Sequence, residues 1–170
     1  MDALPDDGNR YELIEGELLV TRAPRLNHQG ITSNLILAFG NHLKKFPEGK
    51  IYPTPGVIFS VFDAVIPDLV FISYERLAEI SQDEKLCGAP ELIIEILSPG
   101  TENAKRDRQI KRQLYRKYSV QEYWLVDPET TTSEIYRSPK FNQAKLLTLN
   151  DMLTTPLLPQ FHCPAHEVFE

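Results

Sequence analysis

Apolar residues recur at helical spacing in two long stretches of the chain. In "NHQGITSNLILAFGNHLKKF" (27–46) they return every three or four positions, which predicts a helix with Asn27 as its N-cap. The charged segment "TENAKRDRQIKRQLYRKYSV" (101–120) is the second long predicted helix, with Thr101 as its cap. A short helix or a turn is predicted over "YERLAEI" (74–80), and a short helix near the C-terminus.

Strands are predicted where short apolar runs lack a helical stripe and end at turn residues. The segment "YELIEGELLV" (11–20) predicts a hairpin, and residues 133–137 and 144–149 predict an antiparallel pair. Further strands are expected at 50–61, 64–73, 89–97 and 122–129. This order is not a regular alternation of strand and helix. It predicts an α/β fold with a mixed central sheet, flanking helices and antiparallel hairpins.

Composition narrows the class of protein. A chain of 170 residues, 42% of them hydrophobic, is long enough for one domain, which we expect to span residues 1–170. An acidic, polar N-terminus and two distant cysteines favour a cytoplasmic protein with reduced thiols. The net charge of −6 argues against binding nucleic acid through overall electrostatics. Such binding would need a local basic stretch or bridging metal ions.

One predicted strand carries an acid where only apolar residues are expected. In "APELIIEILSPG" (89–100), alternation places Ile93, Glu95 and Leu97 on one face of the strand. An ionised carboxylate in a strand covered on both faces is costly unless a cation meets it. For a lone acid, the simplest partner would be an arginine.

A second acid lies in a similar setting. Asp68 follows Pro67 in "VIPDLVFIS", at an edge or at the start of a strand. If Asp68 and Glu95 lie close together, they repel each other unless a divalent cation separates them. Mg²⁺ is the natural candidate, because it takes oxygen ligands and keeps several waters. Without metal, we expect one of the two carboxyls to have a raised pKa.

The helix that follows offers a cation. Asp107, Lys111 and Tyr115 lie four residues apart, on one stripe beside its apolar face, so Lys111 could reach the sheet. Asp107 and Lys111 could equally form an ordinary surface ion pair. We interpret the arginines of this segment, taken singly, as a solvated helix face.

These features resemble the metal core of the PD-(D/E)XK nuclease superfamily. Leu97 stands where that pattern has its lysine, and Lys111 matches the lysine that some branches carry on the next helix. The wider chain resembles one branch, the Uma-two family of restriction-endonuclease-like proteins. The matching stretches, in the family's order, are "YELIEGEL" (11–18), "VIPDLVFI" (65–72), "APELIIEILSPGT" (89–101), "DRQIKRQLYRKYSVQEYWLVDPE" (107–129) and "LTTPLLPQF" (153–161).

The resemblance implies a restriction-endonuclease-like fold and assigns roles to several residues. Asp68 and Glu95 would be metal ligands, and Lys111 would orient the attacking water or stabilise phosphoryl charge. Glu12 matches a recurrent acid, which is either an auxiliary ligand or base or an exposed strand acid. Auxiliary positions are His28, as a helix-end hydrogen bonder or a proton carrier, and Asp107. We assign Tyr115 and Trp124 to packing, and His162 and His166 to the surface.

The function implied is an endonuclease that uses Mg²⁺ (or Mn²⁺) to hydrolyse DNA phosphodiester bonds. DNA would be bound with low affinity, and a homodimer would help to form a binding groove. Two alternatives stay open at this point. One is a catalytically inactive binding or assembly module that keeps the nuclease fold, and the other is a hydrolase of smaller phosphoesters.

Overall fold

A six-stranded mixed sheet forms the centre of the molecule. The computed structural model describes residues 8–21, 24–98 and 106–170, with side chains from Arg108 onward in the last range. The strand order is β12-β11-β10-β9-β6-β3, with β9 and β10 parallel and the other neighbours antiparallel. The strands are β3 (Gly49–Pro53), β6 (Leu69–Ser73), β9 (Leu92–Ile96), β10 (Glu122–Asp127), β11 (Thr132–Arg137) and β12 (Lys145–Leu147). The predicted α/β class with a mixed central sheet is confirmed.

A second sheet lies beside the first and is built mainly from hairpins. Its order is β2-β1-β5-β4-β8-β7, with strands β1 (Arg10–Ile14), β2 (Glu17–Thr21), β4 (Val57–Ser60), β5 (Asp63–Val65), β7 (Ser81–Gln82) and β8 (Lys85–Leu86). The predicted hairpin over 11–20 is therefore present. Its two turn residues, Glu15 and Gly16, both have positive φ, at 53° and 83°. Tight hairpin turns of this kind favour glycine at the second position.

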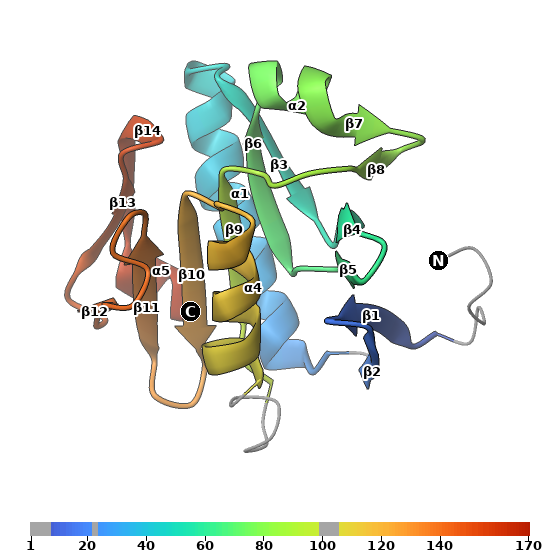
Figure 1. The fold of residues 1–170 in the computed structure, drawn as a ribbon. Helices are drawn as coiled ribbons and strands as arrows, with labels where there is room; N and C mark the ends of the chain where they lie inside the picture. The colour runs from blue at the N-terminus through green and yellow to red at the C-terminus, as the bar shows by residue number, and fades with distance from the viewer. Residues whose placement is uncertain (1–7, 22–23, 99–105) are drawn as a thin grey trace.

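Helices cover both faces of the central sheet (Figure 1). Helix α1 (Leu26–Lys45) packs on one face, together with α5 (Ala165–Phe169) and the hairpin of β13 (Met152–Thr155) and β14 (Leu158–Pro164). The opposite face carries the π-helix η1 (Arg106–Lys111), which continues into α4 (Arg112–Lys117). Helix α2 (Tyr74–Ile80) directly follows β6. None of the helices in the described ranges is long and apolar enough to cross a membrane.

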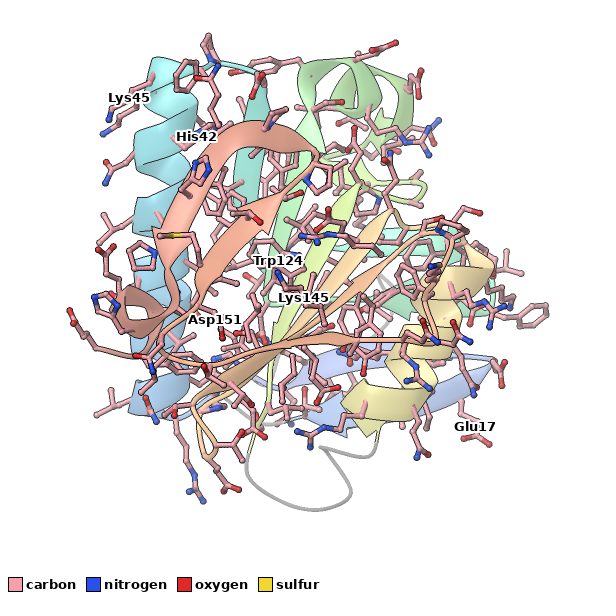
Figure 2. The ribbon with its side chains drawn as sticks, turned by 90° about the vertical axis from the view of Figure 1, so that its left-hand side faces the viewer. Glu17, His42, Lys45, Trp124, Lys145 and Asp151 are labelled. Atoms are coloured by element: carbon pink, nitrogen blue, oxygen red, sulfur yellow. The ribbon has the colours of Figure 1, made fainter. Side chains whose placement is uncertain are left out.

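Strand β9 separates two apolar cores by simple alternation. Leu92, Ile94 and Ile96 belong to the core on the α1 side, whereas Ile93 and Leu97 belong to the core on the α4 side. The α1-side core also contains Trp124, which Figure 2 shows deep within the molecule, while Glu17 on β2 lies at its periphery. Glu95 therefore faces the α4 side, as its position in the strand predicts.

Several predicted elements differ in their boundaries. The strands expected at 50–61 and 64–73 are each divided in two, at Thr54–Gly56 and at Ile66–Asp68, and each break contains a proline, which cannot donate to a sheet. Asn27 is not the N-cap of α1, since that position is Arg25. The second long helix is described only from residue 106, and Thr101 lies outside the described residues. Neither the π-helical first turns of this helix nor the β13–β14 hairpin was predicted.

A buried aspartate fastens the second sheet to the end of α4. The carboxylate of Asp63 accepts hydrogen bonds from the Glu15 backbone N–H at 2.7 Å and the Tyr118 hydroxyl at 2.7 Å. The Lys117 ammonium lies 2.9 Å from the same carboxylate. Burial alone would raise the pKa of Asp63, but these three donors outweigh it and hold that pKa below its ordinary value.

The Asp63 network should make stability depend on acid pH. A carboxylate whose pKa is lower in the folded state stabilises the fold above its unfolded pKa of about 3.9, and loses this effect as pH falls through the folded pKa. At neutral pH, Asp63→Asn should lower the free energy of unfolding by about 1–3 kcal/mol. The difference should shrink below about pH 4, as measured by urea unfolding. A difference that stays constant down to acid pH would contradict this role.

Candidate active site

A lysine buried between two carboxylates defines the candidate active site. Lys111 is only 3% exposed, and Glu12 and Glu95 are 2% and 4% exposed. The Lys111 Nζ lies 2.9 Å from Glu95 Oε1 and 3.0 Å from Glu12 Oε1. Lys111 was expected to point at the Asp68–Glu95 pair and away from solvent; it is buried and reaches Glu95, but the second carboxylate at its ammonium is that of Glu12. Glu12 is a buried member of the cluster, so its alternative as an exposed strand acid is wrong.

Three separate segments bring these side chains together. Lys111 is the last residue of η1 and Tyr115 follows one turn later in α4, so both reach the face of the sheet that carries Glu95. The Tyr115 hydroxyl donates to Glu95 Oε1 at 2.6 Å. Glu12, on β1, also accepts a hydrogen bond from the Ile66 backbone N–H at 2.9 Å. The cluster therefore connects both sheets and the helix.

Asp68 lies next to this cluster, at the start of β6. Its Oδ2 accepts a hydrogen bond from the backbone N–H of Ile96 at 2.9 Å, and Ile96 directly follows Glu95 on β9. The same oxygen lies 3.0 Å from His28 Nε2, and Oδ1 accepts from Arg10 Nη1 at 2.9 Å. Asp68 is 4% exposed, and its contacts with His28 and Ile96 are buried, whereas Arg10 approaches it from a partly exposed position.

Of the two carboxyls expected to compete for ionisation, Asp68 is not the one with a raised pKa. Burial pushes the pKa of Asp68 upward, but the hydrogen bond and charge of His28, the Ile96 N–H and the charge of Lys111 together bring it below the ordinary value. Repulsion between carboxylates is thus not the dominant influence on this residue. The sequence could not reveal this, because His28, Ile96 and Lys111 are distant from Asp68 along the chain.

Tyr115 is held in its neutral form. Burial, followed by the negative charges of Glu95 and Glu12, raises the pKa of its phenol well above the usual value. The hydroxyl can therefore serve as a fixed hydrogen-bond donor to Glu95. The assignment of Tyr115 to packing is incomplete for this reason, although its ring is fully buried among apolar neighbours.

The oxygen-rich donor set fits one class of metal better than others. Across the described ranges, no group of three or more histidine, cysteine, aspartate or glutamate side chains is arranged to hold a metal ion. Mg²⁺ needs only one or two protein carboxylates, since waters and substrate phosphate complete its shell. Asp68 and Glu95 are two buried carboxylates of the type that Mg²⁺ takes, whereas a structural zinc site needs four protein ligands.

The remaining candidates fall outside this cluster or outside the described side chains. Trp124 is fully buried, as its assignment to packing requires, and His162 and His166 are exposed. Asp107 belongs to η1, but its side chain is outside the described part of the chain. Arg108 is not merely solvated, because it bridges Asp127 and Glu134 at 2.8 and 2.9 Å.

Sequence reasoning missed Arg10, whose guanidinium meets Asp68. It is a single basic residue just ahead of the predicted hairpin, and no spacing links it to Asp68. His28 was singled out as an auxiliary position, and its contact with Asp68 matches the hydrogen-bonding alternative. For Tyr115, its position four residues after Lys111 on the predicted helix was the sequence feature that could have indicated a contact with the same carboxylate.

Comparisons with known proteins identify the fold and the family of this chain. A crystal structure from Anabaena variabilis, titled as that of "a putative nuclease belonging to DUF820", superposes with a TM-score of 0.80 at 20% sequence identity. The match covers 98% of this chain and 93% of that one, which shows a shared fold. No curated protein matches the chain. The sequence profile of the Uma2 family, described as "Putative restriction endonuclease", matches residues 1–166. The chain belongs to the Uma2 family of restriction-endonuclease-like proteins.

Proposed function

We propose that this chain is a metal-dependent endonuclease that hydrolyses DNA phosphodiester bonds, with residues 1–170 as a single nuclease-like domain. The observation that carries the proposal is the Lys111 ammonium, held within 3.0 Å of Glu12 and Glu95 in a nearly closed interior. A buried ammonium positioned by fixed partners is suited to stabilise charge that develops during phosphoryl transfer. The family described as restriction endonucleases supports DNA as the substrate.

Each residue of the cluster has a defined task in this proposal. Asp68 and Glu95 would hold Mg²⁺ or Mn²⁺, which supplies charge stabilisation at a phosphoryl oxygen and a more acidic bound water. Lys111 would orient the attacking water or stabilise the phosphoryl oxygens. Glu12 and Tyr115 act as positioning residues, because Glu12 fixes the Lys111 ammonium and Tyr115 fixes the carboxylate of Glu95.

The role of Lys111 can be tested against a second lysine of the same helix. Lys111→Ala should reduce Mg²⁺-dependent cleavage of plasmid and single-stranded DNA by about 10²–10³-fold, the loss typical when one charge-stabilising donor is removed. Metal affinity should stay the same or rise, because a positive neighbour has gone. Lys117→Ala is the matched control, since its ammonium contacts Asp63. Equal activity in both variants would refute the proposed role.

Folding of the Lys111 variant needs its own measurement, because its loss leaves two buried carboxylates without their shared ammonium. We expect it to lower the free energy of unfolding by about 3–5 kcal/mol. Circular dichroism and urea unfolding should show that the variant is still folded under the assay conditions.

If the wild-type protein cleaves small phosphodiesters but no form of DNA, the proposed endonuclease function would have to be replaced by that of a hydrolase of small phosphoesters.

The metal ligands can be tested with two buried aspartates that differ in the proposed role. Asp68→Asn should abolish the heat of Mg²⁺ or Mn²⁺ binding in calorimetric titration and should abolish cleavage. Asp63→Asn is the matched control, because Asp63 is equally buried but contacts only the hairpin turns and the end of α4. It should bind metal like the wild type at neutral pH. Metal binding by Asp68→Asn would contradict the role of Asp68 as a metal ligand, and no metal binding by the wild type would speak for a module without metal-dependent activity.

A further inference from the structure

A cavity of about 330 Å³ opens beside Asp68 and is not used by the cluster around Lys111. Arg10 and His28 line it together with Asp68, so a molecule in this cavity would lie next to a proposed metal ligand. One wall is the N-terminal half of α1, with Gln29 and Thr32, and Pro53 at the end of β3 contributes an apolar surface. Figure 1 shows the first turns of α1 at the same end of the molecule as β1.

The α1 wall presents acceptors more than donors. The Thr32 hydroxyl donates its proton to the His28 carbonyl at 2.9 Å, and the Ser33 hydroxyl donates to the Gln29 carbonyl at 2.9 Å. Thr32 and Ser33 both line the cavity, and because each hydroxyl already donates to a carbonyl of its own helix, its oxygen is left to accept a hydrogen bond from a ligand. The amide of Gln29 is exposed and can donate or accept. A ligand with N–H donors on one edge suits this wall.

The other walls of the cavity carry one cation, Arg10, the carboxylate of Asp68, and apolar side chains. Arg10 uses one nitrogen for Asp68, and its guanidinium is 28% exposed, so it is placed to meet a phosphate. Pro53 and Ile36 offer apolar contacts to a flat ring. One cation, apolar contacts and a row of acceptors together match a nucleotide, which carries a phosphate, a flat ring and an edge of donors.

The depth of the cavity favours an unpaired base over a base paired in a duplex. His28 and Asp68 are 6% and 4% exposed, so the part of the cavity that they line lies below the molecular surface. A base stacked in a duplex cannot reach such a position without leaving the helix, which costs a few kcal/mol, and least when the strand is already single. The net charge of −6 also disfavours an extended duplex contact.

We propose that this cavity binds one unpaired nucleotide of single-stranded DNA and prefers a base with an exocyclic amino group. Arg10 contacts the phosphate, while Thr32, Ser33 and Gln29 accept hydrogen bonds from the amino edge. The inference rests on the proposed function only in placing this nucleotide beside the bond to be cleaved. The binding itself does not require activity.

Oligodeoxycytidylate and oligodeoxythymidylate of equal length form a matched pair of probes. Cytosine carries an amino donor where thymine carries a carbonyl acceptor. Binding is measured by fluorescence anisotropy in EDTA, so that metal-dependent cleavage cannot consume the probe, and at mildly alkaline pH, where cytosine is neutral. We expect the cytidylate probe to bind about three- to tenfold more tightly, as expected for one or two neutral hydrogen bonds. A DNA hairpin duplex of equal charge should bind more weakly than either.

Variants assign the preference to the cavity. The double variant Gln29→Ala/Thr32→Val should bind both single-stranded probes equally, because it removes two of the polar groups on the α1 wall. Gln82→Ala is the matched control, since Gln82 is exposed on β7, in a different part of the fold, and it should keep the preference. Equal binding of the two probes by the wild type, tighter duplex binding, or a preference that survives in the double variant would each overturn the inference.

The outcome is separable from that of the proposed function. If the wild type cleaves DNA but shows no cytidylate preference, only the nucleotide cavity is wrong. If the preference is present and depends on Gln29 and Thr32 while no DNA is cleaved with Mg²⁺ or Mn²⁺, the cavity stands and the catalytic proposal fails.

Discussion

Charge compensation around one lysine holds the three main parts of this molecule together. Glu12 belongs to the hairpin sheet, Glu95 to the central sheet and Lys111 to the helix that covers it, and their charged atoms meet within 3.0 Å. Each charge has lost most of its contact with water. None of the three segments could adopt its position alone, because each would then bury an uncompensated charge at a cost of several kcal/mol. The cluster thus selects how the layers pack as well as what lies at their junction.

The same need to balance buried charge explains why several ionisable side chains lie together at this point of the fold. Asp68 follows a proline-containing break between β5 and β6, and its carboxylate bonds to the backbone of the residue after Glu95. His28, the Ile96 backbone N–H and the charge of Lys111 hold the pKa of Asp68 below its ordinary value against the effect of burial. This junction therefore contains three buried carboxylates, those of Glu12, Asp68 and Glu95, and the cations that balance them. A concentration of buried ionisable groups of this kind supports the functional site proposed above.

The sequence predicted the layers better than the contacts. The alternation of β9 placed Glu95 correctly on the α4 side, because a strand's period of two is fixed by backbone geometry alone. The four-residue spacing likewise brought Lys111 and Tyr115 to one carboxylate. Arg10 beside Asp68 and the shift of the Asp68 pKa depend on segments distant in sequence. The periodicity of apolar residues contains no information about such tertiary contacts. It also did not predict the π-helical turn or the β13–β14 hairpin.

The central claim is that Lys111 serves the reaction and does not merely balance buried charge. The double variant Glu12→Gln/Lys111→Met keeps the net charge of the cluster unchanged while removing the ammonium. Its free energy of unfolding and its Mg²⁺-dependent DNA cleavage should be measured on the same preparation. The account predicts that stability recovers most of what Lys111→Met alone loses, whereas cleavage stays at the level of that single variant. Recovery of wild-type cleavage in the double variant would show that Lys111 is only a structural counter-ion, and would contradict the account.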